Sequence, residues 1–359
     1  MDRIVTRHRL QAFSPAYFKK KGRLFSYSPG NLEAARCLLQ EREDPRPFIT
    51  SGLSQPNETW RNVDIEDLCR FFGNPARFLL RRRLGIYLEE ARALLEDREP
   101  FQLEPLEMYP LQETLVRKRL GGEDLKDLYV PMRASGSLPH GTVGMCLFEG
   151  MRRGVEDFVE NLRNYMAAPP REPIEVTLAV SGFSLRGRVR SIYGERFLHY
   201  RYAKIKPRDQ IRAWIYHLVL NSIPGGGHPR TSLIAGLDSK RGQELQWAVW
   251  EYPPVSNSDE ILGILLRRYW KGLCLPLPFF PLSSWQYASM KLAKGKDPEE
   301  AVAHARKQWT GSRFQRGECQ DLYYQLCFGG ADPFGEEFQR IAEEVFGPIL
   351  DIQRELKAQ

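Results

Sequence analysis

The chain has 359 residues, of which 42% are hydrophobic and 27% are charged, and its formal net charge is +7. This composition is typical of a soluble globular protein with one large or two modest domains. No apolar run is long enough to span a membrane, and the first ten residues lack the apolar core of a signal peptide. The positive charge and a pI near 9.0 suit a nucleic-acid partner.

The six cysteines are scattered along the chain. The closest pair, Cys319 and Cys327, lacks the spacing of a zinc or iron–sulfur site. We therefore expect reduced thiols, a cytoplasmic location, and neither a metal nor another cofactor.

Residues 1–59 read as an irregular arm that is punctuated by five prolines. One helix is predicted at about 32–41, with Asn31 as its cap. A compact domain rarely begins with so long an irregular segment, so we expect the arm to lie on a neighbour.

Two helices are predicted at about 63–72 and 76–84, on either side of a Gly-Asn-Pro break. The second helix carries three consecutive arginines, Arg81, Arg82 and Arg83. They are candidates for contacts with DNA phosphates, and the alternative is that they pair with Glu89 and Glu90. A long helix with an apolar stripe is predicted at about 142–166.

The segments 181–193 and 197–206 alternate apolar and polar residues around Gly194 and Glu195, which predicts a β-hairpin. A helix is predicted over 211–220. With further strands predicted at 174–180, 231–237 and 243–252, we expect one mixed sheet of about five strands with a core at about 174–252. Helices at 256–350 would complete an α/β (α+β) fold.

The predicted hairpin is strongly basic, because the sequence from Ser181 to Arg212 contains nine Lys and Arg residues and only two acidic residues. Its candidates for phosphate contacts are Arg186, Arg188, Arg190, Arg201, Lys204 and Lys206. The candidates for stacking on unpaired bases are Tyr200, Tyr202, Trp247 and Trp250. The alternatives are a solvated basic surface for the cations and core packing for the aromatic rings.

Four segments in this order carry a resemblance to a known family: FFGNPARFLLRRRLGI, RASGSLPHGTVG, FSLRGRVRSIYGERFLHYR and QWAVWEYPP. The chain resembles the C-terminal part of the RecC family, the gamma chains of exodeoxyribonuclease V, over nearly its whole length. The resemblance implies a degenerate RecB-type fold, related to PD-(D/E)XK restriction endonucleases. It also implies that residues 1–59 continue from missing helicase-like domains, and that residues 60–359 form an inactive nuclease-like domain.

The residues at the predicted site depart from those of active RecB-type nucleases. Those enzymes place an Asp two residues after a Gly-Arg pair, and an Asp-x-Lys motif on the next strand. Here Arg190 stands where that Asp is expected after Gly187 and Arg188, and the next strand has no carboxylate. Arginine stays protonated, so it cannot ligate Mg²⁺ and would attract a phosphate instead.

The resemblance therefore implies a non-catalytic module that binds and scaffolds double-stranded or forked DNA together with RecB and RecD subunits. Two alternatives stay open. The chain could be a pure protein–protein interaction module without its own DNA contact. It could also be a magnesium-dependent nuclease whose ligands are displaced to Glu149, Glu156, Glu195 or Asp209.

Overall fold

The computed structural model describes residues 5–20, 23–40, 47–88, 103–238, 245–313 and 315–356. The chain divides into two compact units, residues 1–46 and 47–359. The sequence-based boundary after residue 59 stays a prediction. In the described residues, no helix combines the length and the apolar character that crossing a membrane requires.

The first unit contains a 3-10 turn at Pro15–Phe18 and the helix α1 at Pro29–Leu39. The Ser28 hydroxyl accepts a hydrogen bond from the Asn31 amide at 3.3 Å, so Ser28 caps the helix. The predicted start at Asn31 is therefore wrong, because Pro29 already occupies the first turn.

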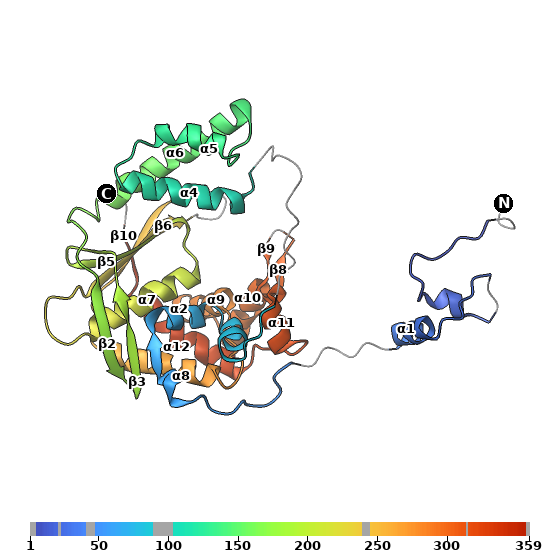
Figure 1. The fold of residues 1–359 in the computed structure, drawn as a ribbon. Helices are drawn as coiled ribbons and strands as arrows, with labels where there is room; N and C mark the ends of the chain where they lie inside the picture. Colours follow the sequence, from blue (N-terminus) through green and yellow to red (C-terminus); the bar gives the residue numbers. More distant parts are fainter. Residues whose placement is uncertain are drawn as a thin grey trace. The chain divides into compact units, whose positions relative to one another are not determined.

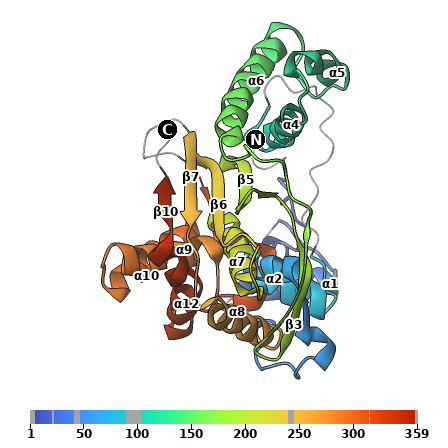
Figure 2. The same ribbon diagram turned by 90° about the vertical axis from the view of Figure 1, so that its left-hand side faces the viewer.

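A five-stranded mixed sheet forms the centre of the second unit, in the order β10–β7–β6–β5–β4 (Figures 1 and 2). Its strands are β4 (Ile192–Tyr193), β5 (Arg196–Lys204), β6 (Thr231–Asp238), β7 (Gln246–Tyr252) and β10 (Arg354–Leu356). β5 and β6 are parallel, whereas the other neighbours are antiparallel. The predicted mixed α/β fold is confirmed. Residues 243–244, predicted to begin the last strand, lie outside the described residues.

A separate three-stranded sheet, in the order β1–β3–β2, supplies the second wall of the fold. Its strands are β1 (Asn62–Asp64), β2 (Ile174–Val180) and β3 (Phe183–Val189). β2 and β3 form an antiparallel hairpin, and β1 joins β3 in parallel. The expectation of a single sheet is therefore wrong for β2 and β3.

The predicted hairpin between 181–193 and 197–206 is also wrong for most of its length. Only β4 pairs with β5, at Ile192↔Phe197 and Tyr193↔Arg196. The longer hairpin lies one segment earlier, between β2 and β3, and it turns at Ser181 and Gly182, whose φ angles are 49° and 79°. Ser191 (φ 60°) then bends the chain out of β3, so the alternating pattern of 181–193 covers two strands in two sheets.

Helices cover both faces of the five-stranded sheet. One face packs against α7 (Pro207–Ser222), and α2 (Ile65–Gly73), α8 (Ser258–Gly272) and α12 (Glu336–Ile352) share that core. The other face packs against α4 (Pro105–Leu120), α5 (Tyr129–Ala134) and α6 (Gly141–Arg163), which Figures 1 and 2 show as a layer above the sheet. Side chains alternate between the two cores: Phe197 and Ile234 belong to the first, Leu198 and Leu233 to the second.

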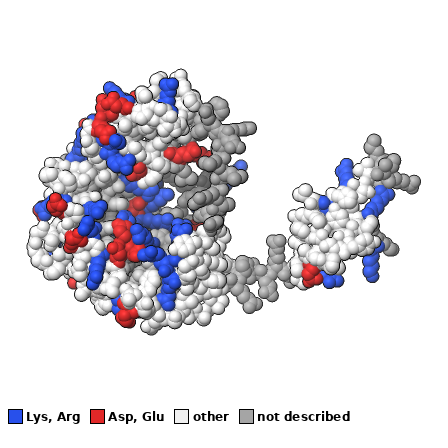
Figure 3. Space-filling model, viewed as in Figure 1, with Lys and Arg blue, Asp and Glu red and all other residues white. Residues whose placement is uncertain are grey.

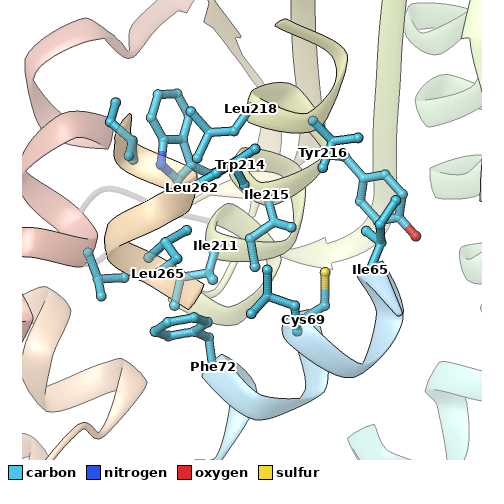
Figure 4. Close-up of a cluster of buried hydrophobic side chains, with 14 of the residues drawn as sticks. Ile65, Cys69, Phe72, Ile211, Trp214, Ile215, Tyr216, Leu218, Leu262 and Leu265 are labelled. Atoms are coloured by element: carbon cyan, nitrogen blue, oxygen red, sulfur yellow. The ribbon is translucent and has the colours of Figure 1, made fainter. Parts of the chain in front are cut away.

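The helix α7 begins four residues before its predicted range of 211–220 and ends two residues after it. Pro207 occupies its first turn, and Trp214 and Ile215 are almost completely buried. Figure 4 shows these side chains meeting Cys69 and Phe72 of α2 and Leu262 of α8. Because α7 is covered on nearly all sides, α2 is held firmly beside it.

The remaining elements complete the second unit. The helices are α3 (Pro75–Phe78), α9 (Pro281–Ala288), α10 (Pro298–Thr310) and α11 (Leu322–Phe328), with π-helical turns at Leu79–Arg83 and Ser289–Ala293. Short 3-10 turns lie at Glu58–Arg61, Leu125–Leu128 and Glu318–Gln320, and a small hairpin joins β8 (Gly311–Ser312) to β9 (Gln315–Arg316). The predicted helical part at 256–350 also contains the hairpin of β8 and β9. Beyond its end, β10 returns to the five-stranded sheet.

Candidate functional site

A cleft of about 610 Å³ opens where the two sheets meet α2 and α7. The junction of β1 and α2 supplies one wall, β2, β3 and the bend after β3 supply the second, and β5 with α7 supplies the third. The polar residues that line it are Asp64, Glu66, Glu175, Arg188, Arg190, Ser191, His199, Arg212 and Tyr216. The structure thus brings Gly187, Arg188 and Arg190 together with residues 197–199 of β5 in one cleft.

Gly187 sets the width of this cleft, because it allows β3 to lie directly against α2. A Cβ atom at this position would lie 2.9 Å from Cδ1 and 3.1 Å from Cγ1 of Ile65. Both distances are shorter than ordinary van der Waals contacts. The glycine of the Gly-Arg pair therefore has a packing role, and it fixes where Arg188 and Arg190 emerge.

The cleft contains three arginines and three carboxylates, so it is less basic than the sequence suggests. Arg188 forms an ion pair with Glu175, and Arg212 forms one with Glu66. Glu66 also accepts a hydrogen bond from the Tyr216 hydroxyl. Sequence reasoning misses these acids because they come from β1, α2 and β2.

The remaining acid and the remaining arginine of the cleft, Asp64 and Arg190, do not form an ion pair with each other. Asp64 caps α2 by accepting the Glu66 amide proton at 2.8 Å. Arg190 has no ion pair or hydrogen bond with any residue that the structure describes. Its guanidinium is therefore the cleft cation that is available to an anion without breaking an internal contact.

His199 on β5 also places a polar atom in the cleft lining. Its Nε2 atom is buried and makes no hydrogen bond within the described part of the chain. Burial lowers the pKa of His199 to about 4, so the ring is neutral at pH 7. A neutral imidazole can present either a donor or an acceptor at Nε2.

The four carboxylates proposed as displaced metal ligands do not form one cluster. Glu149 and Glu156 both bind Arg152 on α6. Glu195 pairs with Arg171, and Asp209 pairs with Arg201, and none of the four acids lines the cleft. Across the described ranges, no three His, Cys, Asp or Glu side chains are grouped as metal ligands.

The three consecutive arginines lie outside the cleft, and each has its own partner. Arg81 donates a hydrogen bond to the Tyr323 hydroxyl at 2.6 Å, and Arg82 pairs with Asp67 at 2.9 Å. Arg83 donates to the carbonyl of Ser54. The alternative partners Glu89 and Glu90 lie outside the described residues.

Most of the other predicted phosphate contacts also lie outside the cleft. Arg186 donates to the Ser184 hydroxyl at 3.1 Å, and Lys204 pairs with Asp238 at 3.4 Å. Arg201 is held between Asp209, at 3.0 Å, and the ring of Tyr109. Lys206 precedes α7 at its N-cap position. Of the nine cationic candidates, the cleft gathers Arg188 and Arg190.

The four stacking candidates divide between the two cores. Trp250 packs against the core around α7, whereas Tyr200, Tyr202 and Trp247 pack against the core around α6. Tyr202 and Trp247 each meet the Phe158 ring edge-on, with ring centroids 5.1 Å apart. These contacts agree with the core-packing alternative, and a role in base stacking stays a prediction.

The surface around the cleft carries both signs of charge. Figure 3 shows Lys and Arg side chains interspersed with Asp and Glu on the face that carries β2, β3 and α2 in Figure 1. Surface ion pairs of this kind contribute little to stability, and they can exchange partners when a polyanion approaches.

Comparison with known proteins identifies the family. A family model described as the RecC C-terminal domain matches residues 60–291. The RecBCD enzyme subunit RecC of Escherichia coli (strain K12) is 25% identical over 292 residues, which cover 79% of this chain and 25% of that protein. The RecC subunit of Mycobacterium tuberculosis (strain CDC 1551 / Oshkosh) is 26% identical over 353 residues, covering 96% of this chain and 31% of that protein.

A putative exonuclease from Eubacterium rectale covers 62% of this chain and 86% of its own, with a TM-score of 0.33 and 10% identity, which is too remote to describe the fold. The chain spans about a quarter of the length of the E. coli relative and about a third of the mycobacterial one. Because the family model covers more than half of the residues, this chain belongs to the RecC C-terminal domain family.

Proposed function

We propose that this chain is a non-catalytic module of a RecBCD-type helicase–nuclease that binds forked or double-stranded DNA and scaffolds partner subunits. Its fold would be a degenerate RecB-type, PD-(D/E)XK-like nuclease fold. The curated relatives are named as RecC subunits of the RecBCD enzyme, which suggests RecB and RecD as the partners. The role of this chain and its partners would be in the repair of DNA double-strand breaks and in recombination.

The observation that carries this proposal is the position of Arg190 in the cleft, where it has no ion pair or hydrogen bond with a described residue. A catalytic Mg²⁺ needs clustered oxygen ligands that are free to bind it. The cleft carboxylates Glu66 and Glu175 are already engaged by guanidinium groups, and Asp64 caps a helix. A fixed positive charge beside them would repel a cation and attract a DNA phosphate.

A pure protein–protein module remains the second candidate, because most of the predicted phosphate contacts already have internal partners. Binding of a labelled fork at several salt concentrations separates the two. If the chain neutralises phosphates, the logarithm of the binding constant falls linearly with the logarithm of salt concentration. An affinity that does not change with salt would refute the phosphate contacts.

A cleavage assay with Mg²⁺ or Mn²⁺ tests the non-catalytic part of the proposal. We expect the forked DNA to remain intact with the wild-type chain. Metal-dependent cleavage that disappears in Asp64→Ala and Glu66→Ala variants would show that the cleft is an active nuclease site. These residues replace Glu149, Glu156, Glu195 and Asp209 as the informative positions, because they line the cleft.

A further inference from the structure

A second cavity, of about 590 Å³, lies on the other face of the five-stranded sheet. It is bounded by α4, α6, β5 and β7, so residues more than 130 positions apart in the chain meet there. Its volume is within the usual range of ligand sites in proteins, which is about 300–1,000 Å³. No predicted site includes the α4 and α6 residues that line it.

Aromatic rings form one side of this cavity. Tyr202 and Trp247 line it together with Phe158 of α6 and Tyr109 of α4. A glycine makes room for one of these rings: a Cβ atom on Gly154 would lie 2.4 Å from the Tyr202 hydroxyl oxygen. Glycine inside a helix usually lowers the stability of the helix. At position 154 it allows the Tyr202 ring to lie directly against α6.

Amide side chains form the polar part of the cavity. Gln112 of α4, Asn161 of α6 and Gln246 of β7 all line it. Asn161 donates a hydrogen bond to the carbonyl of Asp157 at 2.8 Å. The side chains of Gln112 and Gln246 have no hydrogen bond to any described residue. Each free amide offers two donors and one acceptor oxygen, which is the pattern that hydrogen-bonds to the edge of a base.

The charges of this cavity exclude a phosphate as its main ligand. The charged side chains in its lining are Asp157 and Lys204, and Lys204 already pairs with Asp238. An uncompensated carboxylate repels a phosphate, whereas aromatic rings and amides suit a flat, neutral, hydrogen-bonding group.

The strand β5 connects this cavity to the cleft described above. Residues 197–199 of β5 line the cleft, and residues 202–204 line the second cavity. Three residues of extended chain span about 10 Å, so the two sites are close along the strand. Arg201, between them, touches both Asp209 of α7 and Tyr109 of α4.

We propose that this cavity binds an unstacked nucleobase of single-stranded DNA, with Tyr202 and Trp247 as the stacking surface and Gln112 as the edge contact. The proposal rests on the proposed DNA-binding function, and it adds a site that recognises bases rather than phosphates. The sugar–phosphate backbone of the bound DNA would remain outside the cavity, toward the cleft that contains Arg190.

The test compares two oligonucleotides of equal length and charge: one of thymidines, and one whose central nucleotides are abasic. Fluorescence anisotropy of the full chain is expected to show about 5- to 150-fold tighter binding of the thymidine strand, the effect of stacking one base. Equal affinity for the two strands would overturn the base site while leaving salt-dependent phosphate binding intact. Absence of binding to either strand would overturn both proposals.

Two variants locate the effect. Gln112→Ala removes a side chain without a hydrogen bond to described residues, so it should preserve folding and weaken only thymidine-strand binding, about threefold or more. Trp247→Leu should abolish the preference, while Trp250→Leu, on the opposite face of β7, should retain it. A preference that survives both Gln112→Ala and Trp247→Leu would overturn the assignment, as would its loss in Trp250→Leu alone. Thermal melts check that each variant is folded.

Discussion

Replacing Arg190 by alanine tests the proposed phosphate contact directly. Arg190 follows β3 in the bend before β4, and its side chain has no ion pair or hydrogen bond with a described residue. Its removal therefore breaks no internal contact in that part of the chain, and stability should change by less than about 0.5 kcal/mol. Any loss of DNA affinity then reports on binding rather than on folding.

The size of the effect follows from counterion release. Each phosphate neutralised on duplex DNA contributes about −0.9 to the slope of log K against log salt concentration. Removing one contact should therefore make the slope about one unit less negative. Between 50 and 200 mM salt, the wild-type chain should lose about 3.5-fold more affinity than the Arg190→Ala variant. Anisotropy titrations of a labelled fork at four salt concentrations measure this difference.

Arg306→Ala provides the matched control, because it removes the same charge from α10 and Arg306 already pairs with Asp332. We expect its salt slope to equal that of the wild-type chain. The reasoning is refuted if Arg190→Ala keeps the wild-type slope. It is also refuted if both variants change the slope equally, since net charge would then explain the effect.

Three further predictions concern the scaffold. Gly187→Ala should lower the free energy of unfolding by about 1–3 kcal/mol in urea titrations, because its Cβ would meet Ile65, while Gly226→Ala, with nothing within 4 Å, should not. Arg268→Ala should cost about 2 kcal/mol in the same assay, because the guanidinium joins Glu344 and Glu337 of α12 to α8; a change below 0.5 kcal/mol would contradict that role. Burial lowers the pKa of His217 to about 4, below its unfolded value of about 6.5. The unfolded chain then binds more protons between these values, so urea midpoints should fall as pH drops from about 6.5 to 4; a constant midpoint would contradict a buried neutral ring.

Local signals predict several elements well because their ends are marked in the sequence. The strand Ile174–Val180 has the predicted bounds, since Pro173 precedes its alternating pattern and the Ser181–Gly182 turn follows it. The helix α7 is found for a similar reason, although its predicted range is too short. The residues that the prediction leaves out, 207–210 and 221–222, are mostly polar, so the apolar pattern marks only the middle of the helix.

The division into two sheets cannot be predicted from local patterns. β1 has only three residues, too few to show a period of two, and it pairs with β3 more than 120 positions later. The same parallel pairing places Asp64 beside the cleft. A short polar segment gives no local signal of such a distant partner.

Part of the cleft lining can be expected from the Gly-Arg pair, because that pair carries the family resemblance. Gly187, Arg188 and Arg190 do reach one cleft. The acids Glu66 and Glu175 lie outside the basic segment 181–212, so that segment gives no sign of what packs against it. Their pairing with Arg212 and Arg188 reduces the local charge that the sequence suggests.

Hydrogen–deuterium exchange with and without forked DNA tests the central claim most directly, because it reports which segments the DNA covers. The account predicts slower exchange in peptides that contain residues 183–192 and 197–206, with little change in α10 and α12. Protection confined to segments away from the cleft, or no protection at a saturating concentration of the fork, would contradict the claim that this cleft is the DNA contact.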